Sequence, residues 1–357
     1  MKKILVMKFR NIGDVLLITP LLENLKLAFP DAIIDVALNE GTQEMIRLNP
    51  YVDTIRIYDR AQIKSLGFFK RIYKEIAFAY SIREKKYDIV INTTEGDRGA
   101  QLALFSGAKI KIGYKPNKNK LLQNVFTHLL PPQEFRHTIE CNLDALRVLN
   151  LPVKEKKVAI YWAKEDEDII DSMLVKQDFI HIHPVSRWLF KCINDTTMAE
   201  IIDFCKNTLN QEVILTASND PFEIQKIEAI LAQCTSNPLN FAGKLTLKQT
   251  AALNKKAKMF IGVDTAIMHM SAANDTPVLA FFGPSGADHW GPWDNELMQS
   301  GYTTRKGIRT MGKHTVIQED WDCVPCGKDG CNGTKVSDCL MHLDLNTIQK
   351  TIKKMLS

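Results

Sequence analysis

The chain has 357 residues, of which 45% are apolar and 24% are charged, a composition typical of a globular protein with one or two domains. This excludes a chain that is disordered throughout, and the apolar runs are too short for a membrane-spanning helix. The net charge of +5 is concentrated: residues 60–86 hold eight basic and two acidic side chains, and residues 107–120 hold five lysines and no acid. Such stretches favour an anionic partner, such as a phosphorylated lipid, a membrane face or a nucleic acid, although two solvated lysine-rich surfaces would look the same.

The first residues do not have the profile of a signal peptide, because the short apolar run at residues 4–7 is followed at once by Lys8. We therefore expect a cytoplasmic protein. Thiols stay reduced in that compartment, so the eight cysteines are not expected to form a disulfide framework.

In the first half of the chain, short apolar strands alternate with helical stretches. Strands are predicted at residues 4–7, 33–38, 54–57, 88–92 and 110–112, and a helix at residues 15–29, which stops at Pro30. This alternation is typical of a parallel sheet with helices on both faces.

A second series of the same kind follows a polar, charge-rich stretch at residues 150–176, which suits a domain boundary. Its strands are predicted at residues 179–183, 212–216, 239–241, 259–263 and 278–282, and its helices at residues 195–209, 221–234, 247–256, 265–273 and 345–356. We expect an α/β protein with two doubly wound, Rossmann-like domains that face each other across a cleft. The expected segments are residues 1–165, residues 166–343 with a cysteine-rich stretch at 323–339, and a C-terminal helix at 344–357. Ligands bind such sheets beyond the carboxyl ends of the strands.

The first candidate site is Arg10-Asn11-Ile12-Gly13-Asp14, where a strand ends and a helix begins. Asp14 can be an ordinary helix-capping residue, or it can be a general base at the mouth of the cleft. The motif alone does not decide between the two.

The second candidate site follows the first strand of the second half. Ser186, Arg187 and Lys191 offer a hydroxyl, a guanidinium and an ammonium within six residues, which suits a diphosphate. The alternative is that the two cations lie on the surface and that His181 and His183 are ordinary strand residues.

The third candidate site is the stretch from Gly262 to Ala273, in which a buried strand runs directly into a helix. Asp264 and Thr265 lie at the junction, where the free amides of a helix start attract a phosphate. His269 lies one turn further on the same helix face, although it can equally be a core histidine. The glycine-containing loop at residues 242–247 is a weaker candidate for a nucleobase pocket.

These motifs together resemble family 9 glycosyltransferases, the lipopolysaccharide-core heptosyltransferases, over nearly the whole chain. The pieces that carry the resemblance are residues 10–20, 183–191, 242–247, 262–273, 276–284 and 290–293. Two segments are most similar to the heptosyltransferase III branch. They are the motif Arg-Trp-Leu-Phe-Lys-Cys at residues 187–192 and the segment from Trp290 to Trp293.

The resemblance implies a fold of the GT-B type, with the acceptor held by the N-terminal domain and ADP-heptose held by the C-terminal domain. It implies an inverting reaction without a metal or cofactor, in which heptose passes from ADP-L-glycero-D-manno-heptose to a heptose hydroxyl of the inner core. Asp14 would be the general base. Lys191 and the helix start at Asp264-Thr265-Ala266 would stabilise the ADP leaving group.

The same resemblance suggests the other contacts of the site. Because a second anion beside a diphosphate is unfavourable, Asp264 is expected to contact hydroxyls of the donor sugar. The acceptor contacts would be Arg10 and Asn11, and the donor contacts Ser186, Arg187, Glu223, Leu245, Asp264, Thr265, Ala266 and His269. The chain would lie in the cytoplasm, with peripheral binding at the inner face of the inner membrane.

Residues 66–80 mix aromatic and basic side chains, a pattern typical of a helix that lies on an anionic membrane surface. The expected partners are thus a nucleotide sugar, a phosphorylated lipopolysaccharide precursor and an anionic membrane surface. No nucleic acid is expected, because no motif of a nucleic-acid-binding protein is present.

Four cysteines remain outside this interpretation. Cys323, Cys326, Cys331 and Cys339 have the spacing of a small zinc knuckle, but a single C-x-x-C is weak evidence, and packing or redox-sensitive thiols fit as well. Two alternative functions therefore stay open: a family member with another nucleotide sugar or glycan acceptor, and a non-catalytic, zinc-bearing basic binding protein.

Overall fold

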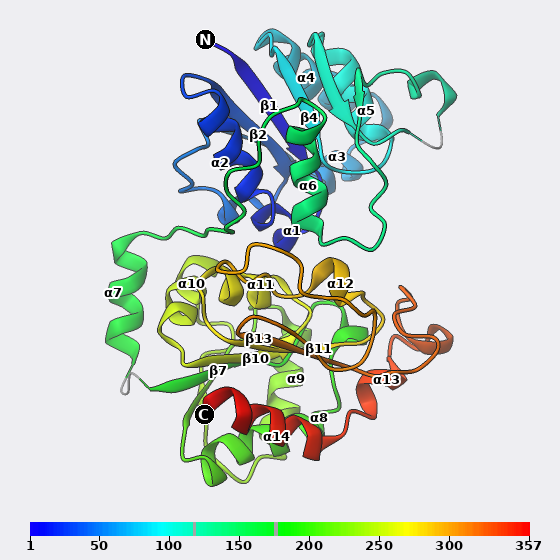
Figure 1. The fold of residues 1–357 in the computed structure, drawn as a ribbon. Coiled ribbons are helices and arrows are strands. Elements are labelled where there is room, and N and C mark those ends of the chain that lie inside the picture. The colour runs from blue at the N-terminus through cyan, green and yellow to red at the C-terminus, as the bar shows by residue number, and fades with distance from the viewer. Residues whose placement is uncertain (117–118, 175–177) are drawn as a thin grey trace. The chain divides into compact units, whose positions relative to one another are not determined.

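The computed structural model describes residues 1–116, 119–174 and 178–357, and the chain divides into two units, residues 1–161 and 162–357 (Figure 1). Lys118, one of the five lysines of the second basic stretch, lies outside the described residues. Each unit contains one sheet of parallel or mostly parallel strands with helices packed on it. The predicted α/β class with two Rossmann-like domains is confirmed.

The first unit is built on a six-stranded parallel sheet in the order β3-β2-β1-β4-β5-β6, the strand order of a doubly wound nucleotide-binding fold. Its elements are β1 (Lys3–Lys8), α1 (Ile12–Leu16), α2 (Thr19–Ala28), β2 (Ile33–Asn39), η1 (Gln43–Met45), β3 (Thr54–Tyr58), α3 (Arg60–Ser65), α4 (Phe68–Glu84), β4 (Ile89–Asn92), α5 (Asp97–Ser106), β5 (Ile110–Gly113), η2 (Lys120–Leu122), β6 (His128–Leu129) and α6 (Thr138–Arg147). The central strands β1 and β4 form the core because their apolar side chains are buried on both faces.

The second unit repeats this order. Its sheet runs β12-β13-β11-β10-β7-β8-β9, and only the edge strand β12 is antiparallel. Its elements are α7 (Lys164–Met173), β7 (Phe179–His183), η3 (Leu189–Lys191), α8 (Asp195–Asp203), η4 (Phe204–Thr208), β8 (Glu212–Leu215), α9 (Pro221–Leu231), β9 (Leu239–Asn240), α10 (Leu247–Lys256), β10 (Met259–Val263), α11 (Ala266–Ala273), β11 (Val278–Phe282), α12 (Ala287–Trp290), β12 (Arg309–Met311), β13 (His314–Gln318), η5 (Cys331–Gly333), α13 (Asp338–Met341) and α14 (Leu345–Leu356). The C-terminal helix α14 packs into the core of this unit through Ile348 and Ile352.

One predicted helix is wrong in detail. The stretch at residues 15–29 forms two helices, α1 and α2, which break at Leu17 and Ile18. The Thr19 hydroxyl donates to the Leu16 carbonyl over 2.9 Å, and Pro20 has no amide hydrogen to continue the first helix. Helix α1 therefore begins earlier than predicted and includes Asp14.

Candidate functional site

In both sheets the strand order reverses beside the first strand of the unit, between β1 and β4 and between β7 and β10. Such a reversal opens a crevice at the carboxyl ends of the two strands, and ligands of doubly wound sheets bind there. The residues that follow these strand ends are the strongest candidates of each unit. They include Asp14 after β1, Lys191 after β7 and Asp264 after β10.

Asp14 is the third residue of α1 and is 8% exposed. Its Oδ2 accepts a hydrogen bond of 3.3 Å from the backbone amide of Asn11, which is the N-cap of this helix. Among the described residues its Oδ1 has no hydrogen-bond partner. The carboxylate is thus held by one oxygen and keeps a lone pair on the other. Arg10 and Asn11 lie exposed in the preceding turn.

Lys8, at the end of β1, is a residue that the sequence analysis did not select. Its side chain is buried, and its ammonium donates to the Thr93 carbonyl and to Oδ1 of Asn142, both over 3.2 Å. Burial lowers the pKa of Lys8 to about 8, although the negative charge of Asp14 opposes that change. The proposed base therefore has a buried cation in its electrostatic surroundings. The signal in the sequence was a lysine placed directly at the end of an apolar strand.

In the second unit, an ion pair joins two of the predicted site residues. The Lys191 ammonium lies 2.6 Å from Oδ2 of Asp264. Burial by itself would raise the pKa of Asp264, but Lys191, His269 and the Ser285 hydroxyl hold it below its usual range. The Asp264 side chain is buried and the Lys191 side chain is partly exposed, so the lysine is the more accessible partner of this pair.

Gly262 allows the two strands that carry this pair to lie close together. It is paired with His183 in the register of β10 and β7. A Cβ atom at Gly262 would lie 2.7 Å from the His183 carbonyl oxygen, which is closer than real Cβ contacts. The glycine therefore helps to place the loops after the two strands next to each other.

The two histidines of β7 are buried and belong to the support of the site. The Thr216 hydroxyl lies 2.6 Å from Nε2 of His181 and 2.9 Å from Nδ1 of His183, and His181 also contacts Asn254. Burial lowers the pKa of His181 to about 4 and that of His183 to about 3. Both rings are therefore neutral at pH 7, which favours the interpretation as strand residues.

The other predicted donor contacts follow β7, β8 and β9. Ser186 is buried and its hydroxyl accepts from the Trp188 amide over 3.1 Å, whereas Arg187 is exposed. Glu223 is buried on α9, and its carboxylate accepts from the Ser218 amide over 2.9 Å. Leu245 packs beside the small core cluster near β9.

At the start of α11 the predicted residues lie as expected from the sequence. Thr265 is the N-cap, and its hydroxyl is buried without a hydrogen-bond partner among the described residues. Ala266 is the first helical residue, and His269 is buried one turn further. This leaves a polar, partly accessible helix start beside the Lys191–Asp264 pair.

The four cysteines of residues 323–339 are free thiols: Cys323 and Cys326 are exposed, Cys331 is half-buried and Cys339 is buried. Within residues 1–116, 119–174 and 178–357, no group of three or more His, Cys, Asp or Glu side chains is arranged to hold a metal ion. The structure therefore gives the zinc-knuckle interpretation no ligand set. Burial and the neighbouring thiols raise the pKa of Cys339 to about 12, so this thiol stays protonated at neutral pH.

A scan of family models matches residues 76–318 to glycosyltransferase family 9 (heptosyltransferase). Lipopolysaccharide heptosyltransferase 3 of Escherichia coli is 30% identical over 294 residues, which cover 80% of this chain and 85% of that protein. The residues from Ser186 to His269 lie inside the stretch matched by the family model, whereas Asp14 lies before it.

Solved structures of the same architecture are also similar to the whole chain. A family 9 glycosyl transferase from Veillonella parvula has a TM-score of 0.80 at 21% identity, and the match covers 99% of this chain and 97% of that one. The E. coli heptosyltransferase WaaC with ADP has a TM-score of 0.73 at 17% identity, with 99% of each chain covered. At these identities the matches establish the fold, and the sequence matches establish the family.

Proposed function

Since the chain belongs to glycosyltransferase family 9, we propose that it is an inverting heptosyltransferase of the lipopolysaccharide inner core. It moves heptose from ADP-L-glycero-D-manno-heptose to a hydroxyl of an acceptor heptose. The 30% identity to lipopolysaccharide heptosyltransferase 3 supports the reaction and the heptosyltransferase III branch. The observation that carries the donor site is the Lys191–Asp264 pair at the point where the second sheet reverses its strand order.

In this proposal Asp14 is the general base. The acceptor hydroxyl oxygen attacks the anomeric carbon from the face opposite ADP, and its proton passes to the Asp14 carboxylate. Oδ1 has no hydrogen-bond partner among the described residues, and because this atom is buried, the side chain must rotate to bring it to the acceptor hydroxyl. The hydrogen bond from Asn11 keeps the carboxylate in place while its charge changes.

The bond from the anomeric carbon to the β-phosphate oxygen breaks in the same step, and ADP leaves with the bonding electrons. Lys191 and the amides at the start of α11 stabilise the negative charge that collects on the diphosphate. Asp264 orients the Lys191 ammonium through their ion pair and accepts hydrogen bonds from hydroxyls of the donor sugar.

The remaining residues provide binding contacts in this proposal. Ser186, Arg187 and His269 contact the diphosphate. The Thr265 hydroxyl, which has no partner among the described residues, hydrogen-bonds to the diphosphate as well. Glu223 and Leu245 contact the ribose and adenine. Arg10 and Asn11 contact the acceptor.

The heptosyltransferase III branch adds a side-branch heptose to the inner core, so the experiment is a transfer assay in which the acceptor is lipopolysaccharide that lacks this heptose. The purified chain is incubated with ADP-heptose and, in parallel, with UDP-linked and GDP-linked sugars. We expect release of ADP and an acceptor that gains the mass of one heptose. Transfer from a UDP or GDP sugar, with ADP-heptose left intact, would contradict the proposal.

A further inference from the structure

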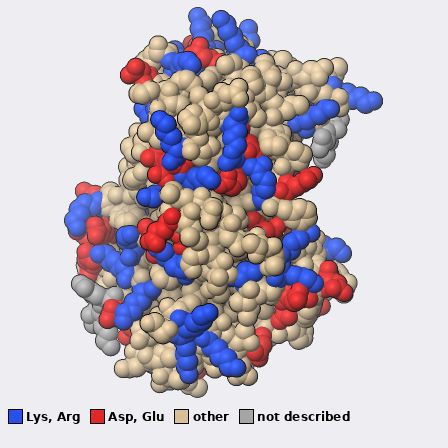
Figure 2. All heavy atoms as spheres, in the orientation of Figure 1, with Lys and Arg blue, Asp and Glu red and all other residues tan. Residues whose placement is uncertain are grey.

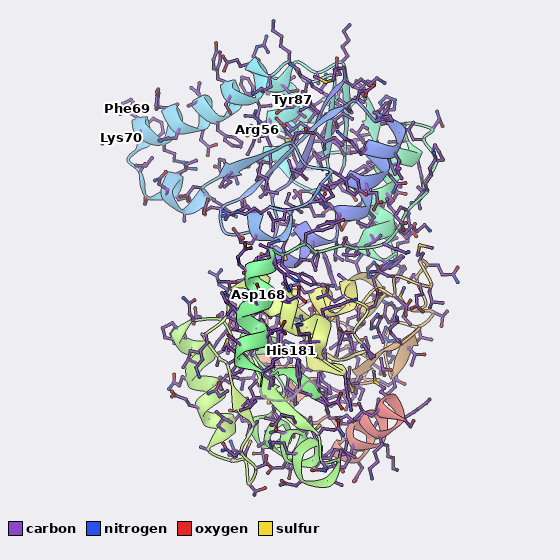
Figure 3. All side chains as sticks on the ribbon, turned by 90° about the vertical axis from the view of Figure 1, so that its left-hand side faces the viewer. Arg56, Phe69, Lys70, Tyr87, Asp168 and His181 are labelled. Atoms are coloured by element: carbon purple, nitrogen blue, oxygen red, sulfur yellow. The ribbon has the colours of Figure 1, made fainter. Side chains whose placement is uncertain are left out.

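Helix α4 of the first unit has a single buried side chain, that of Ile82. Six apolar or aromatic side chains along the helix are exposed to solvent: Phe68, Phe69, Ile72, Tyr73, Ile76 and Tyr80. Phe69 is 85% exposed and lies with Lys70 at the outer end of the helix, away from the sheet (Figure 3). Contiguous exposed apolar surface of this kind marks an interaction site.

The same helix carries positive charge. Lys70, Arg71 and Lys74 are exposed among the aromatic residues. Glu75 is the one acidic residue between positions 60 and 83, and its carboxylate accepts from the Tyr58 hydroxyl over 2.6 Å. Figure 2 shows lysine and arginine side chains gathered at the end of the first unit where Figure 1 labels the N-terminus and α4. The exposed face therefore combines apolar side chains with cations.

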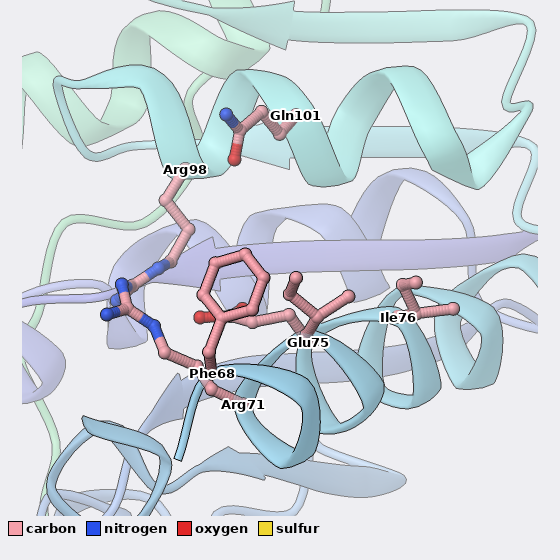
Figure 4. A pocket seen from close by; sticks show the side chains of 7 residues that line it. Phe68, Arg71, Glu75, Ile76, Arg98 and Gln101 are labelled. Carbon is pink, nitrogen blue, oxygen red and sulfur yellow. The ribbon is translucent and has the colours of Figure 1, made fainter. Parts of the chain in front are cut away.

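A cavity of about 550 Å³ lies between α4 and α5 (Figure 4). Its walls include Phe68, Ile72 and Ile76, and the guanidinium groups of Arg71 and Arg98 point toward one another at its end. Arg98 also lies over the Tyr58 ring, 4.2 Å from its centroid. Within the described residues, neither arginine forms an ion pair with a carboxylate. Glu75 also lines the cavity, and Figure 4 shows its carboxylate directed toward the two guanidinium groups, so these three side chains carry a net charge of +1. This net positive charge fits an anion, and the apolar walls fit the hydrocarbon attached to it.

We propose that this face of the first unit docks on an anionic phospholipid membrane. The two arginines bind a lipid phosphate at the mouth of the cavity, and Phe69 and Tyr73 enter the interfacial layer, where aromatic side chains are favoured. A membrane is favoured over a free anion because the apolar residues extend along the helix far beyond the cavity. None of the helices in the described part of the chain is long and apolar enough to cross a membrane, so the docking is peripheral.

The test measures binding of the full chain to vesicles of phosphatidylglycerol and phosphatidylcholine in equal amounts, by co-sedimentation and without any sugar donor. Each cation at an anionic surface contributes about fivefold to binding. The double variant Arg71→Gln/Arg98→Gln should therefore bind roughly 25-fold more weakly. The matched control is Lys350→Gln/Lys354→Gln, which removes the same charge from exposed positions of α14 in the second unit. It should bind as the wild type does.

A second pair of variants tests the aromatic contribution. Phe69→Ser should weaken binding several-fold even in high salt, where the charge contribution is screened, whereas Ile308→Ser, another exposed apolar residue, should not. Equal binding to phosphatidylcholine alone, or unchanged binding by the arginine variant, would overturn the proposal. Tight binding of inorganic phosphate without binding to vesicles would also overturn it, because the cavity would then be a site for a free anion. Any of these results leaves the proposed transfer reaction standing.

Discussion

The carboxyl ends of the two sheets carry the same kinds of side chain, a lysine and a buried aspartate, and they differ in the exposure of the lysine. At the carboxyl end of the first sheet the lysine is buried: the Lys8 ammonium donates to a backbone carbonyl and to a side-chain amide oxygen, and Asp14 keeps one oxygen unpartnered among the described residues. At the carboxyl end of the second sheet the lysine is more exposed: Lys191 is paired with the buried Asp264, and its side chain is 22% exposed.

The different exposure of the two lysines bears on the chemistry that we propose for the carboxyl end of each sheet. A base needs an oxygen that no hydrogen-bond donor already occupies, and in the proposed reaction the buried Oδ1 of Asp14, which has no partner among the described residues, meets this need once the side chain rotates. A site that receives an anionic leaving group needs an accessible cation in a fixed position, and the buried Asp264 provides that position for Lys191. In the proposed reaction, one fold repeated twice thus supplies a base at the first sheet and a cation for the diphosphate at the second.

The largest effect on turnover is expected from a substitution at the carboxyl end of the first sheet. Asp14→Asn should lower kcat by about 10²- to 10⁴-fold, because an amide cannot take the proton of the acceptor hydroxyl. The fold should persist, since the amide oxygen of asparagine can still accept from the Asn11 amide. Affinity for ADP, measured by calorimetry, should not change. Asp31→Asn, an exposed change in the same unit, is the control, and near-normal turnover of the Asp14 variant would show that another group is the base.

At the carboxyl end of the second sheet, Asp264→Asn should lower kcat by about tenfold to a hundredfold, because the Lys191 ammonium loses the partner that orients it. ADP affinity should not fall, since a negative charge near the diphosphate is removed. The split between turnover and affinity separates orientation from binding. Glu212→Gln breaks another lysine–carboxylate pair of the same unit, at the start of β8, and should leave turnover unchanged. Equal losses in the two variants would argue for a general effect on stability.

The smallest effect is one on stability, and it concerns the neutral, buried histidines of β7 in the second sheet. Burial lowers the pKa of His183 to about 3, whereas the unfolded chain binds this proton near pH 6.5. Between these values the unfolded state holds more protons, so the free energy of unfolding falls as the pH falls. From pH 7 to pH 5 this group should cost about 2 kcal/mol, and His183→Gln should remove that part of the loss.

Urea unfolding followed by tryptophan fluorescence measures this change in the right unit, because all five tryptophans lie between residues 162 and 357. His128→Gln in the first unit is the control. If the wild type and the His183 variant lose the same free energy between pH 7 and pH 5, then His183 is not buried as a neutral ring.

The sequence predicted the central strands of both sheets well, because strands buried on both faces are short apolar runs. Strands β7, β10 and β11 have the predicted bounds. Strand β13 was not predicted, since it buries His314, Thr315 and Gln318 and therefore lacks an apolar run. Its burial depends on tertiary contacts such as the hydrogen bonds that the Gln318 side-chain amide donates to the carbonyls of Gly283 and Ser285.

The candidate residues of the site could be selected from motifs, but their pairing could not. Lys191 and Asp264 are 73 positions apart, and they meet because β10 lies beside β7 in the sheet. Lys8 was not selected because its local sequence does not show that it is buried, whereas in the fold its ammonium donates to Oδ1 of Asn142 on α6. In both cases the decisive fact is which elements pack together, and local sequence does not contain it.

The central claim is that ADP binds at the carboxyl end of the second sheet, in contact with Lys191. The most direct measurement is calorimetry of ADP binding to the wild type and to Lys191→Ala, with UDP, GDP and NAD as competitors. We predict selective binding of ADP that weakens by about tenfold or more in the variant, as expected for the loss of a charge-assisted contact. Indifference to ADP, a preference for another nucleotide, or equal ADP binding by the variant would contradict the account.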